Sequence, residues 1–130
     1  MNPEENLEEL EELLGEVEEE NKTSPIIVEG EKDIIALRKL GITGEILRLN
    51  TGLSIPDFCD TIAQKYKSCI LLTDWDKKGG RLCSVIKKNL ENRVICNVTF
   101  RGLFAKLTAS RTVEGLPSWI ETLRKKINVG

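Results

Sequence analysis

The sequence predicts a single α/β domain built on a parallel sheet of about four strands, with helices on both faces. Short apolar runs alternate along the chain with longer segments of helical periodicity, and this alternation favours parallel strands joined by right-handed crossovers. The chain has 130 residues, of which 40% are hydrophobic and 31% charged, which suits one folded domain with its own core.

Residues 1–24 are expected to form an acidic helical extension of the domain. Asn2 can cap this helix, and Pro3 suits its first position. Its apolar positions recur at helical spacing, at Leu7, Leu10, Leu14 and Val17. We consider two roles for it: a surface helix with a solvated acidic face, or a nucleic-acid mimic that masks the rest of the protein.

Charge is distributed unevenly along the chain. Residues 1–24 carry ten glutamates and one lysine, a balance of −9, whereas residues 25–130 carry 11 acidic and 18 basic residues, a balance of +7. The net charge of −2 therefore hides a basic body, which is typical of proteins that bind phosphate backbones.

The body, residues 25–130, begins with two strand–helix units. An apolar strand over 26–28 leads to a helix over 31–40, which ends near a glycine. A second strand over 45–49 leads to a helix beginning at Ser54, where an S-x-x-D start signal occurs.

The second half of the body repeats this alternation. A third strand over 68–73 is followed by a charged loop and a helix over 79–91, and a fourth strand is expected over 93–98. Two amphipathic helices complete the chain. Their apolar positions are Phe100, Leu103, Phe104 and Leu107 in the first, and Leu116, Trp119, Ile120, Leu123 and Ile127 in the second.

The overall properties of the sequence exclude several classes of protein. No apolar run approaches the ~20 residues that a membrane span needs, and the acidic N-terminus does not resemble a targeting signal, so we expect a cytoplasmic protein. Four cysteines occur without a C-x-x-C pair, which predicts buried free thiols rather than a zinc site.

Acidic residues stand where the first and third strands end. The commonest arrangement of four such strands is the order 2-1-3-4, which makes these two strands neighbours and places their carboxyl ends at the switch-point crevice. Glu29 follows the first strand, and Asp74 and Asp76 follow the third. Three acids that converge in a chain without histidine suggest a hard metal ion held by oxygen. A second V-E-G triplet, Val113 to Gly115, follows no strand, so we interpret it as a coincidence.

The two acidic segments together resemble the motifs of the Toprim domain, which is found in topoisomerases, bacterial primases, 5S ribosomal RNA maturases, OLD-family nucleases and RecR-type proteins. Val28-Glu29-Gly30-Glu31-Lys32-Asp33 resembles its first motif, and Thr73-Asp74-Trp75-Asp76-Lys77-Lys78-Gly79 its second. The resemblance covers about residues 25–100. The short length is similar to that of the small stand-alone Toprim proteins of archaea and some bacteria.

The resemblance implies a site and a cofactor. Glu29, Asp74 and Asp76 would be the catalytic residues and would hold one or two Mg²⁺ (or Mn²⁺) ions, with the glutamate also acting as a general acid or base. The supporting residues are then assigned by position. Phosphate contacts or second-shell groups are expected at Lys32, Asp33, Lys77, Lys78 and Arg81, loop residues at Gly30, Gly79 and Gly80, and a base-stacking or loop-covering residue at Trp75. Gly79 and Gly80 are expected to let the chain turn beside the metal.

The sequence departs from several members of this family. Tyr66 is the only tyrosine and falls on the apolar face of a predicted helix, which argues against a topoisomerase. The chain also has no room for the additional domains of primases and 5S maturases. The module would therefore act alone or with a protein partner that supplies substrate specificity.

Three functions are weighed. The first is a metal-dependent enzyme acting on phosphodiesters of RNA or DNA, most simply a nuclease. The second is a non-catalytic module that binds nucleic acid or a ribonucleoprotein, as RecR-type proteins do. The third is an aspartyl phosphotransferase of the haloacid-dehalogenase kind, which also uses D-x-D but places it after the first strand. The choice between RNA and DNA and the oligomeric state stay open.

Overall fold

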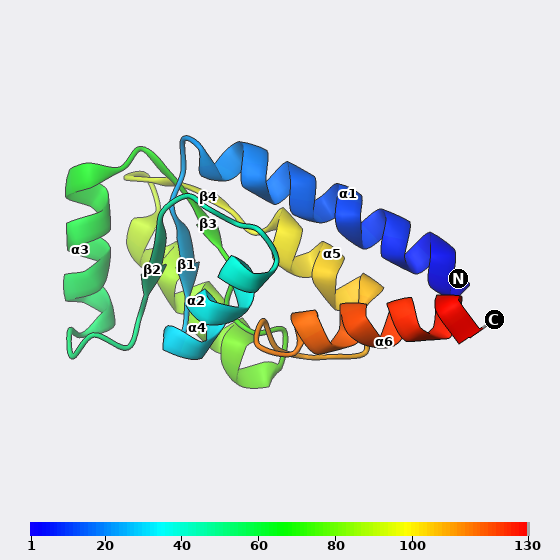
Figure 1. Ribbon diagram of the computed structural model, residues 1–130. Helices are drawn as coiled ribbons and strands as arrows, with labels where there is room; N and C mark the ends of the chain where they lie inside the picture. The colour runs from blue at the N-terminus through cyan, green and yellow to red at the C-terminus, as the bar shows by residue number, and fades with distance from the viewer. Residues whose placement is uncertain (130) are drawn as a thin grey trace.

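Within the described residues, 1–129, the computed structural model contains one four-stranded parallel sheet in the predicted order β2-β1-β3-β4. The strands are β1 (Ile26–Val28), β2 (Ile46–Arg48), β3 (Ser68–Leu71) and β4 (Ile95–Asn97). They run downward in Figure 1, so their carboxyl ends lie together at the lower edge of the sheet. The predicted α/β class is confirmed, and each strand lies within its predicted range or coincides with it.

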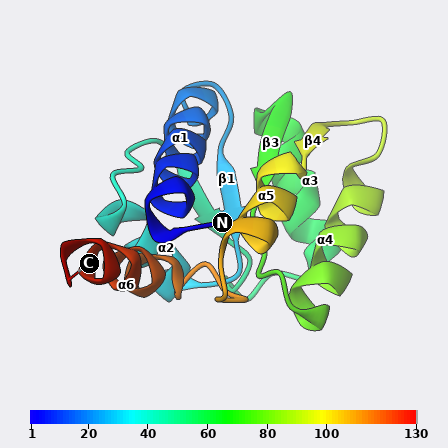
Figure 2. The ribbon, with the colours of Figure 1, turned by 90° about the vertical axis from the view of Figure 1, so that its right-hand side faces the viewer.

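Helices cover both faces of the sheet. They are α1 (Pro3–Asn21), α2 (Glu31–Lys39), α3 (Ile55–Lys65), α4 (Lys77–Leu90), α5 (Thr99–Leu107) and α6 (Leu116–Val129). Figure 2 shows α1, α2 and α6 on one side of β1 and β3, and α3 and α4 on the other. Helix α4 begins two residues before its predicted start because Asp76 caps it: Asp76 Oδ1 accepts a hydrogen bond from Gly79 N at 2.7 Å.

Alternating residues of the strands face two separate cores. On β1, Ile26 and Val28 join the larger cluster with α1, α2, α5 and α6, whereas Ile27 joins the smaller cluster with α3 and α4. On β3 the alternation repeats, with Ile70 in the first cluster and Leu71 in the second. Strands buried on both faces read as continuous apolar runs, which is the pattern of the sequence.

The acidic helix α1 packs by its apolar side. Leu10 and Val17 are fully buried in the larger cluster, while most of its glutamates are exposed to solvent. Asn2 Oδ1 accepts a hydrogen bond from Glu5 N at 2.8 Å, as expected for the cap. Helix α1 lies beside α5 and α6 (Figures 1 and 2).

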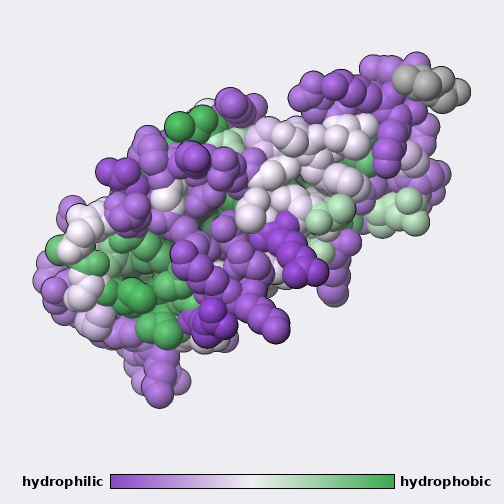
Figure 3. All heavy atoms as spheres, turned by 90° about the horizontal axis from the view of Figure 1, so that it is seen from below, coloured by the Kyte–Doolittle hydropathy of each residue, from purple (hydrophilic) through white to green (hydrophobic). Residues whose placement is uncertain are grey.

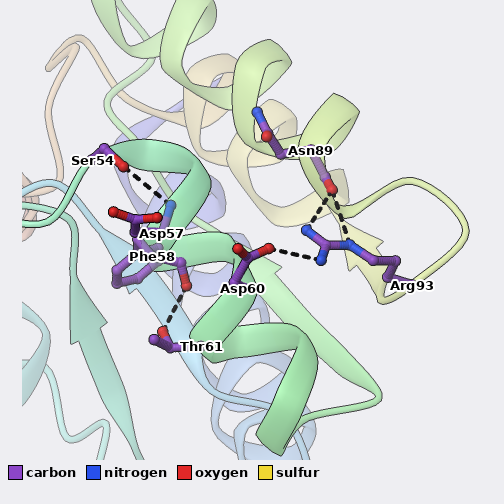
Figure 4. Close-up of polar contacts among 7 residues, drawn as sticks. All are labelled: Ser54, Asp57, Phe58, Asp60, Thr61, Asn89 and Arg93. Carbon is purple, nitrogen blue, oxygen red and sulfur yellow. Dashed lines mark hydrogen bonds and ion pairs between the residues drawn. The ribbon is translucent and has the colours of Figure 1, made fainter.

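Helices α3 and α4 are tied together on the opposite face (Figure 4). Ser54 accepts a hydrogen bond from Asp57 N at 3.2 Å, which confirms the predicted start of α3. Arg93, just after α4, forms an ion pair with Asp60 of α3 at 2.8 Å and also donates to the carbonyl oxygen of Asn89. The ion pair joins α3 to the turn that follows α4.

The cysteines and the tyrosine take structural positions. All four thiols are free; Cys59, Cys69 and Cys83 are buried, and Cys96 is half-buried because it lies on the edge strand β4. Tyr66 packs against the smaller core cluster, and its hydroxyl donates a hydrogen bond to Glu45. No helix in residues 1–129 is long and apolar enough to cross a membrane.

Candidate functional site

A cavity of about 640 Å³ opens at the carboxyl ends of β1, β2 and β3. We call it the acid cleft. Its lining comprises Glu29, Gly30, Glu31, Lys32, Asp33, Leu49, Asn50, Ile55, Asp74, Lys78, Leu82 and Glu114. None of these belongs to α1, so within the described residues the acidic helix does not line the cleft.

Glu29 and Asp74 meet in this cleft although 45 residues separate them in sequence. Glu29 Oε2 accepts a hydrogen bond from Asp74 N at 2.9 Å. The pairing of β1 with β3 brings the two strand ends together, with Ile27 opposite Leu71. The sequence-based expectation that these residues lie in one crevice is therefore confirmed.

Asp74 is held from the other side by the loop between α5 and α6. Its Oδ1 accepts a hydrogen bond from Val113 N at 2.9 Å. Burial raises the pKa of the Asp74 carboxyl, the Val113 N–H opposes that shift, and the negative charges of Glu29, Asp76 and Glu114 raise the pKa further. The carboxylates thus repel one another, which is the electrostatic condition that a bound cation relieves.

Glu114 is a site residue that the sequence analysis missed. It is exposed, lines the cleft, and lies close enough to raise the pKa of both Asp33 and Asp74. The Val113–Gly115 triplet that we interpreted as a coincidence follows no strand, as expected, but the fold brings it to the acids. The repeated letters were the one available signal.

Arg101 of α5 was also missed. Its guanidinium donates to the carbonyl oxygen of Thr73 at 3.1 Å and to that of Asp74 at 3.2 and 2.7 Å. Thr73, which is fully buried, donates its hydroxyl to Gly79 O at 2.7 Å. Together these bonds fix the backbone that carries Asp74.

Asp76 and Asp33 each cap a helix, but only Asp33 lines the cleft, and Asp76 lies outside the lining. Asp76 caps α4 as described above, and Asp33 Oδ2 accepts a hydrogen bond from Gly30 N at 3.1 Å. Asp33 is only 7% exposed. Burial raises the pKa of Asp33, the Gly30 N–H lowers it, and the charges of Asp74 and Glu114 raise it again. Asp33 therefore holds the loop that follows Glu29.

The predicted cations divide into two groups. Lys32 and Lys78 line the cleft, whereas Lys77 and Arg81 lie on the exposed surface of α4 outside the lining. Among residues 1–129, none of these four side chains takes part in an ion pair with a protein carboxylate. All four are exposed, so their charges face solvent or a ligand.

The expected reason for Gly79 and Gly80 is wrong. Both lie in the first turn of α4, and neither has a positive φ. Gly79 is instead required by close approach, since an added Cβ would stand 1.8 Å from Asp74 O. A Cβ at Gly80 would make an ordinary contact of 3.6 Å with Arg101 Nη2. Gly30 is extended at the N-cap of α2 and has open space around it.

Trp75 turns toward the protein. Its ring stacks on Phe104 with centroids 5.8 Å apart and an interplanar angle of 15°, and its Nε1 donates to Ser110 O at 2.5 Å. Its backbone N–H donates to Arg111 O at 2.9 Å. These contacts support the loop-covering interpretation of Trp75 over base stacking.

The chemistry of the donor set fits Mg²⁺, although no ready-made cage is present. In residues 1–129, no three acidic or thiol side chains lie close enough together to hold an ion. Mg²⁺ needs only one or two carboxylates, because waters and substrate phosphate complete its coordination. Glu29 and Asp74 each use one carboxylate oxygen for a backbone N–H, and their second oxygens form no hydrogen bond within the described residues.

Comparison with known proteins agrees with this arrangement. A family model described as the Toprim domain matches residues 24–107. A UPF0292 protein of Thermoplasma volcanium is 41% identical over 102 residues, which cover 78% of this chain and 86% of that protein. A UPF0292 protein of Methanosarcina acetivorans is 35% identical over 127 residues, 95% of this chain and 88% of that protein. A solved structure of an Aquifex aeolicus protein superposes with a TM-score of 0.70 at 27% identity, over 79% of this chain and 94% of the other.

Proposed function

We propose that this chain, which belongs to the Toprim domain family and to the UPF0292 group of proteins, is a metal-dependent enzyme. It would act on phosphodiester bonds of nucleic acids, most simply as a nuclease. Toprim membership itself points to a metal-binding, nucleic-acid-related role. The observation that carries the finer proposal is the convergence of Glu29 and Asp74 in a cleft that Lys32 and Lys78 also line.

Each group has a role in this proposal. Glu29 and Asp74 would hold Mg²⁺ or Mn²⁺, and the nearby negative charge of Asp76 would help to attract the ion. The ion would neutralise charge on the attacking and leaving oxygens of a displacement at phosphorus. Glu29 transfers a proton at the reacting phosphate. Lys32 and Lys78 bind the phosphates on either side, and Arg101 keeps the Asp74 backbone in place.

A non-catalytic binding module is the second candidate. It is favoured by one observation, namely that the described acids do not form a closed ion cage. Against it, anionic groups facing a phosphate backbone weaken binding unless a cation joins them. A haloacid-dehalogenase-like phosphotransferase is less well supported, because the D-x-D pair follows β3 rather than β1.

The proposal is tested by incubating the protein with labelled single-stranded and double-stranded RNA and DNA, each with Mg²⁺, with Mn²⁺ and with chelator. Cleavage that needs metal and is lost in Asp74→Asn supports the enzyme. Metal-dependent binding without turnover on any of these substrates would favour the binding module. The affinity should fall with salt, with a logarithmic slope of about −0.9 per phosphate neutralised on duplex DNA and less on single strands.

A further inference from the structure

One wall of the acid cleft is apolar. Leu49, Ile55 and Leu82 line the same cavity as Glu29 and Asp74, and we call these three residues the apolar wall. They come from three places in the fold: the residue just after β2, the first turn of α3 and the second turn of α4. Each is half-buried, so each leaves part of its side chain exposed to the cavity or the solvent.

The apolar wall is fixed relative to the acids. Leu49 N donates to Val28 O at 2.9 Å, and Asn50 N donates to Glu29 O at 3.1 Å, so the end of β2 is bonded to the residues that carry the catalytic carboxylate. Leu49 and Ile55 also pack against the smaller core cluster. A ligand held at Glu29 therefore meets an apolar surface in a defined position.

Further apolar surface lies nearby, outside the lining of the cleft. Leu53, two residues before Ile55, is 47% exposed and lines a separate cavity with Phe58 and Tyr66. Figure 3 views the molecule from below and shows an apolar region toward the end where α3 lies, bordered by hydrophilic surface. Single exposed apolar side chains are ordinary in proteins, but several that gather at the mouth of a charged cleft mark a ligand site.

We infer that the apolar wall receives an unpaired nucleobase of the strand whose phosphate lies at the acids, so that the substrate is single-stranded at the reacting position. This inference rests on the proposed function. A base in a duplex is stacked and paired, and offers the protein only its groove edges and a charged backbone. A cavity of about 640 Å³ is within the usual range of small-ligand sites and suits a nucleotide rather than a helix.

Polar groups around the wall match this ligand. Lys32 and Lys78 lie in the same lining and can contact the phosphates that flank the base. Asn50 is exposed, and its side chain forms no hydrogen bond within residues 1–129. A free amide both donates and accepts, which is the combination that the edge of a base requires.

The inference is tested by measuring how tightly the Leu82→Gln variant binds a single-stranded oligonucleotide, with Val85→Gln as the matched control. Val85 lies one turn further along α4, is 44% exposed and does not line the cleft. Fluorescence anisotropy with Mg²⁺ measures the affinity for three labelled probes: a single-stranded oligonucleotide, the same strand with abasic residues, and its duplex. Urea unfolding of each variant checks that the fold is retained.

The wild type should bind the intact strand about fivefold to tenfold more tightly than the abasic strand. Leu82→Gln should lose a similar factor on the intact strand and nothing on the abasic one, and Val85→Gln should match the wild type on all probes. Equal losses on both strands, or equal wild-type affinity for strand and duplex, would overturn the inference.

The two proposals fail separately. Base-dependent binding without turnover on any nucleic acid would contradict the enzyme and leave the base site standing. Metal-dependent cleavage with base-independent binding would overturn the base site alone. Absence of any strand binding by the wild type would overturn both.

Discussion

Replacing Gly79 with alanine should disrupt the loop between β3 and α4, residues 72–76, which we call the acid loop. The added Cβ would lie 1.8 Å from Asp74 O, 2.5 Å from Asp74 C and 2.9 Å from Asp74 Cα. All three atoms belong to the backbone, so relief requires movement of the strand end or of α4. Overpacking of this kind typically costs about 1–3 kcal/mol, occasionally more. Alanine would regain up to ~1 kcal/mol over glycine in a helix. Because backbone atoms must move, we take the upper end of the overpacking range, about 3 kcal/mol, and the gain in helix propensity reduces the expected net loss to about 2 kcal/mol.

Gly80→Ala is the matched control. Its Cβ would lie 3.6 Å from Arg101 Nη2, an ordinary contact, so the helix propensity of alanine should stabilise the protein by up to ~1 kcal/mol. Urea unfolding followed by circular dichroism measures both variants. Equal unfolding free energies for Gly79→Ala and Gly80→Ala would refute the close approach of α4 to Asp74.

Three further variants probe the supports of the site. Arg101→Gln should lower the unfolding free energy by about 1.5–3 kcal/mol. It should also reduce turnover while strand affinity stays unchanged, and Arg111→Gln serves as the inert control. Unchanged turnover in Arg101→Gln would argue against a positioning role for Arg101. Leu10→Ala should destabilise the protein by about 2–5 kcal/mol, because Leu10 is fully buried, whereas substitution of the exposed Glu9 by glutamine should not. Equal unfolding midpoints for the two variants would contradict the packing of α1. In Asp76→Asn the new asparagine would still cap α4, so the melting temperature of the metal-free protein should be retained or raised. Mg²⁺ at 100 times its dissociation constant should stabilise the wild type by about 2.7 kcal/mol, and this stabilisation should be smaller in Asp76→Asn. A full metal response in Asp76→Asn would place the ion elsewhere.

Much of the framework was predictable because its signals are local. Apolar runs marked the strands, Ser54 marked a helix start, and the alternation of strands and helices led to the strand order. That order in turn predicted the meeting of Glu29 and Asp74, since parallel strands end at one edge.

The contributions of Glu114 and Arg101 could not be predicted in this way. Both reach the acid loop from the C-terminal helical region, and nothing in the local pattern says where α5 or the loop after it packs. The role of Gly79 was predicted wrongly for a related reason. A glycine suggests a turn, but Gly79 instead allows α4 to approach the backbone carbonyl of Asp74. Such contacts depend on tertiary packing, which the residues next to Gly79 in sequence do not reveal.

The central claim is that Glu29 acts on the reacting phosphate. Glu29→Gln retains a side-chain oxygen able to accept the Asp74 N–H, so the loop should keep its place while the proton-transfer group is lost. Glu121→Gln, on the exposed surface of α6, removes the same charge outside the cleft and serves as the control.

Single-turnover cleavage of one labelled strand, measured together with its affinity, tests this claim most directly. General acid–base groups contribute about 10²–10⁴-fold, so Glu29→Gln should slow cleavage by at least ~100-fold while affinity stays the same or rises as charge repulsion is relieved. The control should match the wild type in both quantities. A Glu29→Gln rate within about tenfold of the wild type, well short of the 10²–10⁴-fold range, would contradict the account.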